Sequence, residues 1–194
     1  MRRIANFIDA GHFTHTTARY GRMAADFRLL AERMAGECDL LRTYYWDCLP
    51  YLSADSDDQA RSRFESARSF LCALSRLPRF VVREGQLERR GFEHDGTPIY
   101  GQKRVDVGLA VDLVVLATKH LITDAAILAG DSDFVPAIEA AKSEGVAVHL
   151  FHGPHAHRDL IRACDERTYV GQEFLSVVAR KRTPRLQIKA LATA

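Results

Sequence analysis

Short apolar runs alternate with longer amphipathic stretches along most of this chain. Five runs have the length and the branched or aromatic composition of buried strands: residues 4–8, 40–46, 80–83, 125–129 and 146–151. Helical spacing of apolar residues predicts helices between and after them: residues 16–34, 59–77, 105–120, 134–144 and 156–163. Strands separated by helices indicate a parallel sheet in a three-layer α/β sandwich. A short strand or helix is expected after residue 163.

Two shorter runs, residues 86–90 and 98–102, flank a turn-rich segment that contains His94, Asp95 and Gly96. This pattern predicts a hairpin or a protruding loop.

The 194 residues suffice for one domain with a proper core, which we expect to span residues 1–179. The last residues, 180–194, carry basic side chains without an acid and predict a mobile basic tail.

Carboxylates follow two of the predicted strands. Asp9 follows the first apolar run, and Asp131 and Asp133 follow the run that ends at Ala129. A lone Asp after a strand is usually a turn or cap residue, and Ser132 or Asp133 could cap the next helix. Ligands of parallel sheets bind outside the carboxyl ends of the strands, so two such strands together indicate one acidic site. Hard cations such as Mg²⁺ and Mn²⁺ bind sites of this kind.

The predicted helix at residues 105–120 carries two further aspartates. Asp106 lies in its first turn, whereas Asp112 lies inside an almost unbroken apolar run. They are six residues apart and do not share a helix face, so we favour Asp106 as the ligand. Asp112 is either part of the site or a core Asp that bonds a neighbouring backbone group or Lys. His12, three residues after Asp9, could contact a phosphate or a leaving group, or simply form the turn.

Overall composition narrows the function less than these motifs do. The net charge of +2 does not by itself establish nucleic-acid binding, but four basic residues precede or flank the Asp106 helix: Arg89, Arg90, Lys103 and Arg104. They would contact RNA phosphates or form a solvated loop. The four cysteines form no CxxC pair, and the histidines at residues 149–157 fit a loop better than a zinc site.

The N-terminal apolar run is too short and too polar for a signal peptide or a membrane span. We therefore expect a cytoplasmic protein without membrane contact. The sequence contains neither a P-loop nor a GxGxxG motif, which argues against ATP or dinucleotide binding.

Three segments carry a resemblance to a known family: FIDAGHF (residues 7–13), KRVDVGLAVDL (103–113) and LAGDSDFVPAI (128–138). They resemble the signature blocks of the NYN domain, in its LabA-like bacterial branch of the PIN-like nuclease superfamily. With YYWDCLPY (residues 44–51), the resemblance spans residues 3 to about 165. It implies a Rossmann-like PIN fold with a mainly parallel central sheet, an aspartate cluster that binds Mg²⁺ or Mn²⁺, and ribonuclease activity.

By matching motif, the resemblance implies the catalytic residues Asp9, Asp106, Asp131 and Asp133, of which Asp9, Asp106 and Asp131 hold the metal. Asp112 matches the second helix aspartate of the family. The chain departs from the pattern at two points. Gly11-His12 stands where many members have Asn, and Ala129 stands where many have Ser.

These features predict a Mg²⁺- or Mn²⁺-dependent ribonuclease, a hydrolase whose substrate is single-stranded RNA. Two other functions stay open. The chain could be a catalytically silent RNA-binding or regulatory module that retains a metal or phosphate site. It could also be a phosphatase or a receiver-like phosphoacceptor domain with Asp9 as nucleophile, although the block after Asp9 lacks the second acid of those designs. Assembly into a homo-oligomer is left open.

Overall fold

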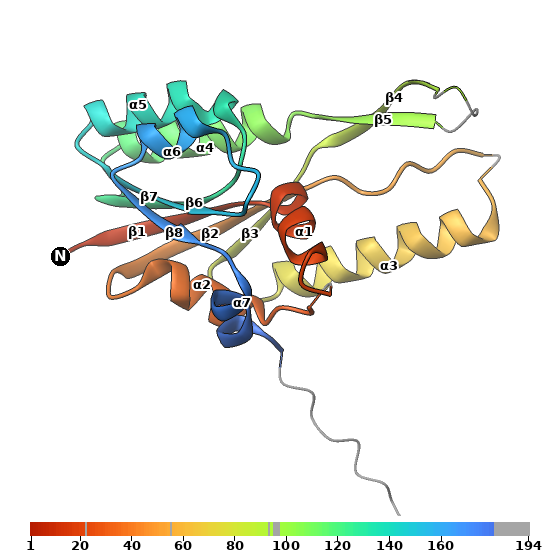
Figure 1. Cartoon of the computed structure of the whole chain (residues 1–194), viewed down its shortest axis with the longest axis horizontal. Helices are drawn as coiled ribbons and strands as arrows, with labels where there is room; N and C mark the ends of the chain where they lie inside the picture. The colour runs from red at the N-terminus through yellow and green to blue at the C-terminus, as the bar shows by residue number, and fades with distance from the viewer. Residues whose placement is uncertain (22, 55, 93, 95–97, 181–194) are drawn as a thin grey trace, which may run out of the picture.

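A six-stranded parallel sheet forms the centre of the molecule (Figure 1). The computed structural model describes residues 1–21, 23–54, 56–92, 94 and 98–180. The strand order is β3-β2-β1-β6-β7-β8, and every neighbouring pair is parallel. The strands are β1 (Arg3–Asp9), β2 (Asp39–Asp47), β3 (Phe80–Glu84), β6 (Asp124–Leu128), β7 (Ala147–His152) and β8 (Glu166–Tyr169). This arrangement confirms the predicted α/β fold class.

Helices cover both faces of the sheet. One face packs against α4 (Val105–Thr118), α5 (Val135–Ser143) and α6 (Arg158–Ala163). The other packs against α1 (Ala10–Ala18), α2 (Phe27–Ala35), α3 (Asp58–Ser75) and α7 (Gln172–Val178). Strand β6 shows why its sequence is apolar throughout: Ala125 and Ile127 face the first layer, and Ala126 and Leu128 face the second. A strand buried on both faces has no polar alternation.

The single helix expected over residues 16–34 is wrong. The structure has two helices there, because α1 ends at Ala18 and α2 begins at Phe27. Gly21 adopts a φ of 79° between them. The Asp26 carboxylate starts α2 by accepting hydrogen bonds from the amides of Arg28 at 3.0 Å and Leu29 at 3.3 Å. The apolar spacing at residues 29–34 therefore belongs to α2 alone.

The hairpin prediction is confirmed. Strands β4 (Gln86–Phe92) and β5 (Pro98–Lys103) pair antiparallel, while Asp95 and Gly96 of the expected turn lie outside the described residues. Figure 1 shows the hairpin extending away from the sheet, above the N-terminal half of α3. The rings of Tyr51 and Tyr100 lie 5.1 Å apart and join the hairpin to the segment that follows β2. Strand β5 leads directly into α4, so the hairpin is anchored beside the start of that helix.

The C-terminal part contains both a strand and a helix, β8 and α7, where one or the other was expected. The backbone amide of Arg180 donates to the carbonyl of Ala24 at 2.8 Å, and the rest of the basic tail lies outside the described residues. Within the described part of the chain, no helix has both the length and the apolar character needed to cross a membrane.

Candidate active site

Three carboxylates mark the carboxyl edge of the sheet. Asp9 is the last residue of β1, Asp47 is the last residue of β2, and Asp131 follows β6 by three positions. Strand β1 lies between β2 and β6, so the ends of these strands are neighbours at one edge. Asp106 reaches the same edge from the first turn of α4. The sheet topology thus groups acids that are far apart in the sequence.

An open pocket of about 520 Å³ holds the three predicted metal ligands. Its lining consists of Asp9, Asp106 and Asp131 together with Gly11, His12, His15, Gly130, His155 and His157. Asp133 does not line this pocket. It lies with Asp106 on a neighbouring groove of about 530 Å³ between α4 and α5. The structure therefore brings Asp9, Asp106 and Asp131 together and leaves Asp133 beside them.

Burial dominates the electrostatics of Asp9. This residue is only 8% exposed, and the loss of hydration raises the pKa of its carboxyl to about 6. Its hydrogen bond from the amide of His12, at 3.2 Å, opposes that rise, whereas the negative charges of Asp106 and Asp47 add to it. Asp9 is a carboxyl that a nearby cation would favour in its ionised form.

The pKa of the Asp106 carboxyl is raised by the same two effects as that of Asp9. Burial raises its pKa first, and the charges of Asp131 and Asp133 raise it further. Arg104, just before α4, has a φ of 74°, a left-handed conformation that is uncommon outside glycine. This turn joins the hairpin to α4. It sets the start of the helix and therefore the position of Asp106 at the pocket.

Asp131 has a local role as well as a place in the pocket. Its carboxylate accepts a hydrogen bond from the amide of Asp133 at 3.1 Å and caps the 3-10 turn Ser132–Phe134. The expectation that Ser132 or Asp133 caps the helix is therefore wrong. Helix α5 itself begins after Phe134 without a side-chain cap. The cap leaves the carboxylate of Asp131 exposed at the pocket.

The chemistry of these side chains fits a hard divalent cation. All three offer carboxylate oxygens, the ligand type that Mg²⁺ and Mn²⁺ prefer. Burial first, and then repulsion by neighbouring carboxylates, raises the pKa of Asp9 and Asp106. Among the described residues, no group of three or more His, Cys, Asp or Glu side chains is arranged to hold a metal ion in this structure. Magnesium usually keeps several waters and binds one or two carboxylates. An open acidic pocket is compatible with that mode of binding.

His12 fills the space between two loops at this edge. Its Nε2 accepts a hydrogen bond from the amide of Gly153 at 3.1 Å, which puts the ring proton of the neutral form on Nδ1. Its ring lies so close to Gly130 that a Cβ there would overlap it. Burial, followed by the nearby histidines, lowers the pKa of His12 to about 4. His12 is therefore neutral at pH 7. It lines the pocket as a packed, hydrogen-bonded side chain.

Asp112 lies on the other side of α4, away from the acidic pocket. Its Oδ2 accepts a hydrogen bond from the indole Nε1 of Trp46 at 3.1 Å and lies 3.5 Å from Nε of Arg83. Trp46 packs across Gly108, where a Cβ would overlap its ring. These contacts make Asp112 a link between α4 and the strands β2 and β3. The partners are Trp and Arg, where a backbone group or Lys was expected.

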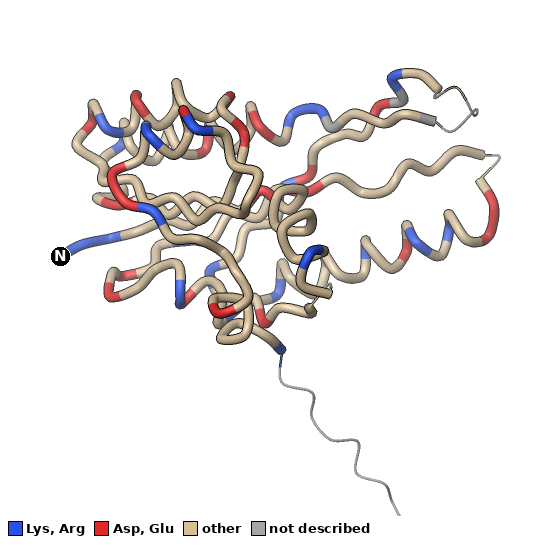
Figure 2. The backbone as a smooth tube through the Cα atoms, viewed as in Figure 1, with Lys and Arg blue, Asp and Glu red and all other residues tan. Residues whose placement is uncertain are grey.

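The predicted RNA-binding residues lie on the hairpin and at its junction with α4. Figure 2 shows basic segments at both places, close to acidic ones. Lys103 forms an ion pair with Glu88, and the side chain of Arg90 lies against Gly101. Arg104 is exposed, and the side chain of Arg89 is outside the described part of the structure. Positive charge therefore flanks the acidic pocket on the α4 side.

Asp47 was not predicted as a site residue from the sequence. Burial raises the pKa of its carboxyl to about 6, and its charge raises the pKa of Asp9. Its signal was present in the sequence, because the second predicted strand ends in an aspartate as the first one does. His15, His155 and His157 line the pocket as well, which the sequence did not predict. These histidines lie on α1 and on the loop after β7. The two segments are distant in the sequence, and the order of strands in the sheet brings them together.

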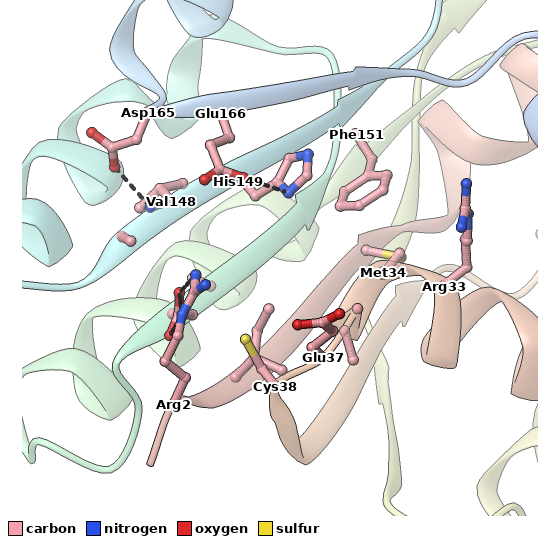
Figure 3. Close-up of a pocket in the computed structure, with 16 residues that line it drawn as sticks. Arg2, Arg33, Met34, Glu37, Cys38, Val148, His149, Phe151, Asp165 and Glu166 are labelled. Atoms are coloured by element: carbon pink, nitrogen blue, oxygen red, sulfur yellow. Dashed lines mark hydrogen bonds and ion pairs between the residues drawn. The ribbon is translucent and has the colours of Figure 1, made fainter.

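A second pocket, of about 480 Å³, lies at the amino edge of the sheet (Figure 3). Several of its polar side chains are engaged in local contacts. Arg2 pairs with Asp124, Asp165 accepts the amide of Val148 at 2.8 Å, and His149 contacts Thr168 at 2.9 Å. This pocket is at the opposite end of the strands from Asp9 and shares no residue with the acidic pocket.

Comparisons with known proteins agree with this architecture. The fold is similar to the crystal structure of a protein of unknown function from Vibrio parahaemolyticus, with a TM-score of 0.60 and 19% sequence identity. The alignment covers 90% of this chain and 96% of that one, and the likeness concerns the fold alone. No curated protein matches the sequence. The model of the NYN domain matches residues 3–171. The chain therefore belongs to the NYN domain family of the PIN-like superfamily, whose members are generally nucleases.

Proposed function

We propose that this protein is a Mg²⁺- or Mn²⁺-dependent ribonuclease that hydrolyses single-stranded RNA in the cytoplasm, within the LabA-like branch of its family. One observation carries the proposal: Asp9, Asp106 and Asp131 line a single open pocket at the carboxyl edge of a parallel sheet. Family membership supports a nuclease-like function independently of that geometry.

Asp9, Asp106 and Asp131 would hold the cation. When bound, such an ion supplies Lewis-acid stabilisation of the charge that develops in phosphodiester hydrolysis. Asp9 is fixed by its position at the end of β1 and by the amide of His12, so its carboxylate needs little reorganisation. Asp133, on the far side of Asp106, adds negative charge without lining the pocket.

The basic residues of the hairpin would draw the RNA toward these carboxylates. A polyanion is repelled by an acidic pocket unless positive charge lies nearby. Arg90 lies in β4, Lys103 lies in β5, and Arg104 precedes Asp106 by two positions; Arg89 belongs to the same strand as Arg90. Contacts of this kind reach phosphates and are insensitive to base sequence.

Cleavage of a short fluorescent single-stranded RNA tests the proposal. We expect the purified protein to cleave it with Mn²⁺ or Mg²⁺ and to stop when EDTA is added. Asp106→Asn should lose the activity, while Glu139→Gln, which changes an exposed acid on α5, should retain it. Binding of the RNA without metal-dependent cleavage would instead identify a silent RNA-binding module. A trapped phospho-aspartate at Asp9 would identify a phosphoacceptor.

We further propose that a second copy of the chain covers α4. This helix exposes Val107, Val111 and Val115 at four-residue intervals, with exposed fractions of 69%, 53% and 39%. A helix that is apolar on all sides is normally buried. In a twofold antiparallel arrangement, Asp133 near the start of α4 would approach Lys119 of the partner subunit, which follows the end of that helix. In that arrangement the surface would be self-complementary in charge as well as apolar.

A further inference from the structure

The acidic pocket has a second side that the proposed chemistry does not use. His15 comes from α1, and His155 and His157 come from the segment between β7 and α6. In the sheet, β6 separates β7 from β1, and α4 packs against β1 and β2. His155 and His157 therefore lie toward the β7 side of the pocket, and His15 joins them through the contact of its ring with that of His155. Asp106 lies toward the β2 side.

Arg19 lies beside these histidines, in contact with His155, although it does not line the pocket itself. We call the four residues the histidine face: Arg19, His15, His155 and His157. The guanidinium of Arg19 lies 2.7 Å from Nε2 of His155. Because arginine can only donate, Nε2 accepts and the proton of the neutral ring is on Nδ1. The rings of His15 and His155 lie 5.3 Å apart, which holds them as one group.

His157 is oriented by the loop that bears it. Its backbone amide donates to the carbonyl of Gly130 at 2.9 Å, next to Asp131. Its Nδ1 accepts the amide of Asp159 at 3.3 Å, which leaves the proton of the neutral ring on Nε2. The carboxylate of Asp159 lies 3.6 Å from Nδ1 of His157 and weakens this histidine as an anion ligand. The stronger donors are therefore Arg19, His155 and His15.

The fold does not require these side chains. His15, Arg19, His155 and His157 are all exposed, and exposed polar pairs usually contribute little to stability. The histidine face combines one permanent cation with imidazole N–H donors, beside a pocket of carboxylates. Guanidinium and N–H donors are the groups that bind phosphate oxygens.

We propose that the histidine face binds a backbone phosphate of the RNA next to the phosphate that is cleaved. The inference rests on the proposed function, because it takes the chain of the substrate to pass the carboxylates. Basic groups then lie on both sides of the acidic pocket, with the hairpin toward α4 and the histidine face toward β7. The substrate extends past the cleaved bond on the β7 side, so a polynucleotide is bound better than a single nucleotide.

Equilibrium binding of a fluorescent single-stranded RNA in EDTA tests this inference without any cleavage. The double variant Arg19→Ala/His155→Ala should bind about tenfold more weakly, the loss expected for charge-assisted hydrogen bonds. Its salt dependence should be less steep by about 0.7 log units for each lost phosphate contact. The control His120→Ala/Arg167→Ala removes the same residue types from exposed positions outside the pocket and should bind like the parent.

A second variant guards against a loss of folding. Arg19→Glu changes one exposed side chain and should weaken binding more than alanine does, with an unchanged melting temperature. In cleavage assays, both Arg19 variants should raise KM and leave kcat nearly unchanged.

The outcomes separate this inference from the proposed function. If the parent binds RNA but does not cleave it, and the variants bind RNA more weakly, hydrolysis is overturned and the histidine face is supported. If the parent cleaves RNA, and the variants have the same affinity for RNA and the same KM as the parent, the histidine face is overturned and hydrolysis is supported. A parent that binds no RNA would overturn both.

Discussion

Replacing Asp9 with Asn should stabilise the metal-free protein at neutral and alkaline pH. The folded protein raises the pKa of Asp9 from 3.8 to about 6, first through burial and then through the charge of Asp106. Between these two values the folded state binds more protons than the unfolded chain. The free energy of unfolding therefore falls as the pH rises through this window. Above about pH 6 the ionised carboxylate costs stability, and Asn removes that cost.

The size of the effect follows from the shift. A rise of about two pKa units corresponds to at most roughly 3 kcal/mol of unfolding free energy at pH 8. Asn keeps the other role of Asp9, because it also caps helix N-termini well and can accept the amide of His12. For a chain of this size, we expect a rise in melting temperature of several degrees and at most about 10 °C.

Thermal melts of parent and Asp9→Asn in EDTA measure this directly. The melting temperatures should nearly coincide at pH 4 and diverge at pH 8, with the variant higher. Mn²⁺ should then raise the melting temperature of the parent more than that of the variant. The exposed acid Glu139 provides the control, since Glu139→Gln should not change the pH dependence. A variant that melts below the parent at pH 8 in EDTA would show that Asp9 stabilises the apo fold, and the reasoning would be refuted.

Three further predictions follow from other residues. Asp131→Asn should abolish RNA cleavage with an unchanged or higher melting temperature in EDTA; a clear drop would mean that its cap at the 3-10 turn dominates. Neutralising Arg89 and Arg90 together should weaken binding equally for RNAs of different sequence in fluorescence titrations, and unchanged binding at every salt concentration would exclude the hairpin. Val111→Asp should convert a dimer to a monomer in light scattering, whereas Val177→Asp, also at an exposed valine, should not; a parent that is already monomeric would exclude assembly through α4.

Much of the fold could be predicted because its signals are local. The apolar runs before Asp9 and Asp131 are short and fully buried in the structure, as their composition requires. The predicted helix over residues 16–34 failed because its apolar positions come from α2, while α1 begins directly at Ala10. Nothing in the spacing of apolar residues marks the break, which depends on Gly21 and the Asp26 cap.

The grouping of three carboxylates in one pocket, which is the candidate site, was predicted in part for the same reason. Motifs identified Asp9, Asp106 and Asp131, because each lies at the end of a strand or the start of a helix. Asp112 and the histidine face could not be assigned from spacing. Asp112 accepts a hydrogen bond from Trp46, which lies 66 positions away in the sequence. His155 contacts Arg19 at a separation of 136 positions. Contacts of that range depend on the order of strands in the sheet, which the sequence alone did not supply.

A crystal of this protein soaked in Mn²⁺ tests the central claim most directly. The anomalous signal of manganese locates the ion without assumptions about its ligands. We expect a peak in the pocket between Asp9, Asp106 and Asp131, with carboxylate oxygens at roughly 2.0–2.2 Å. The peak should be missing from Asp106→Asn crystals soaked in the same way. A pocket that stays free of manganese at saturating concentration, or a peak only at other carboxylates, would contradict the account.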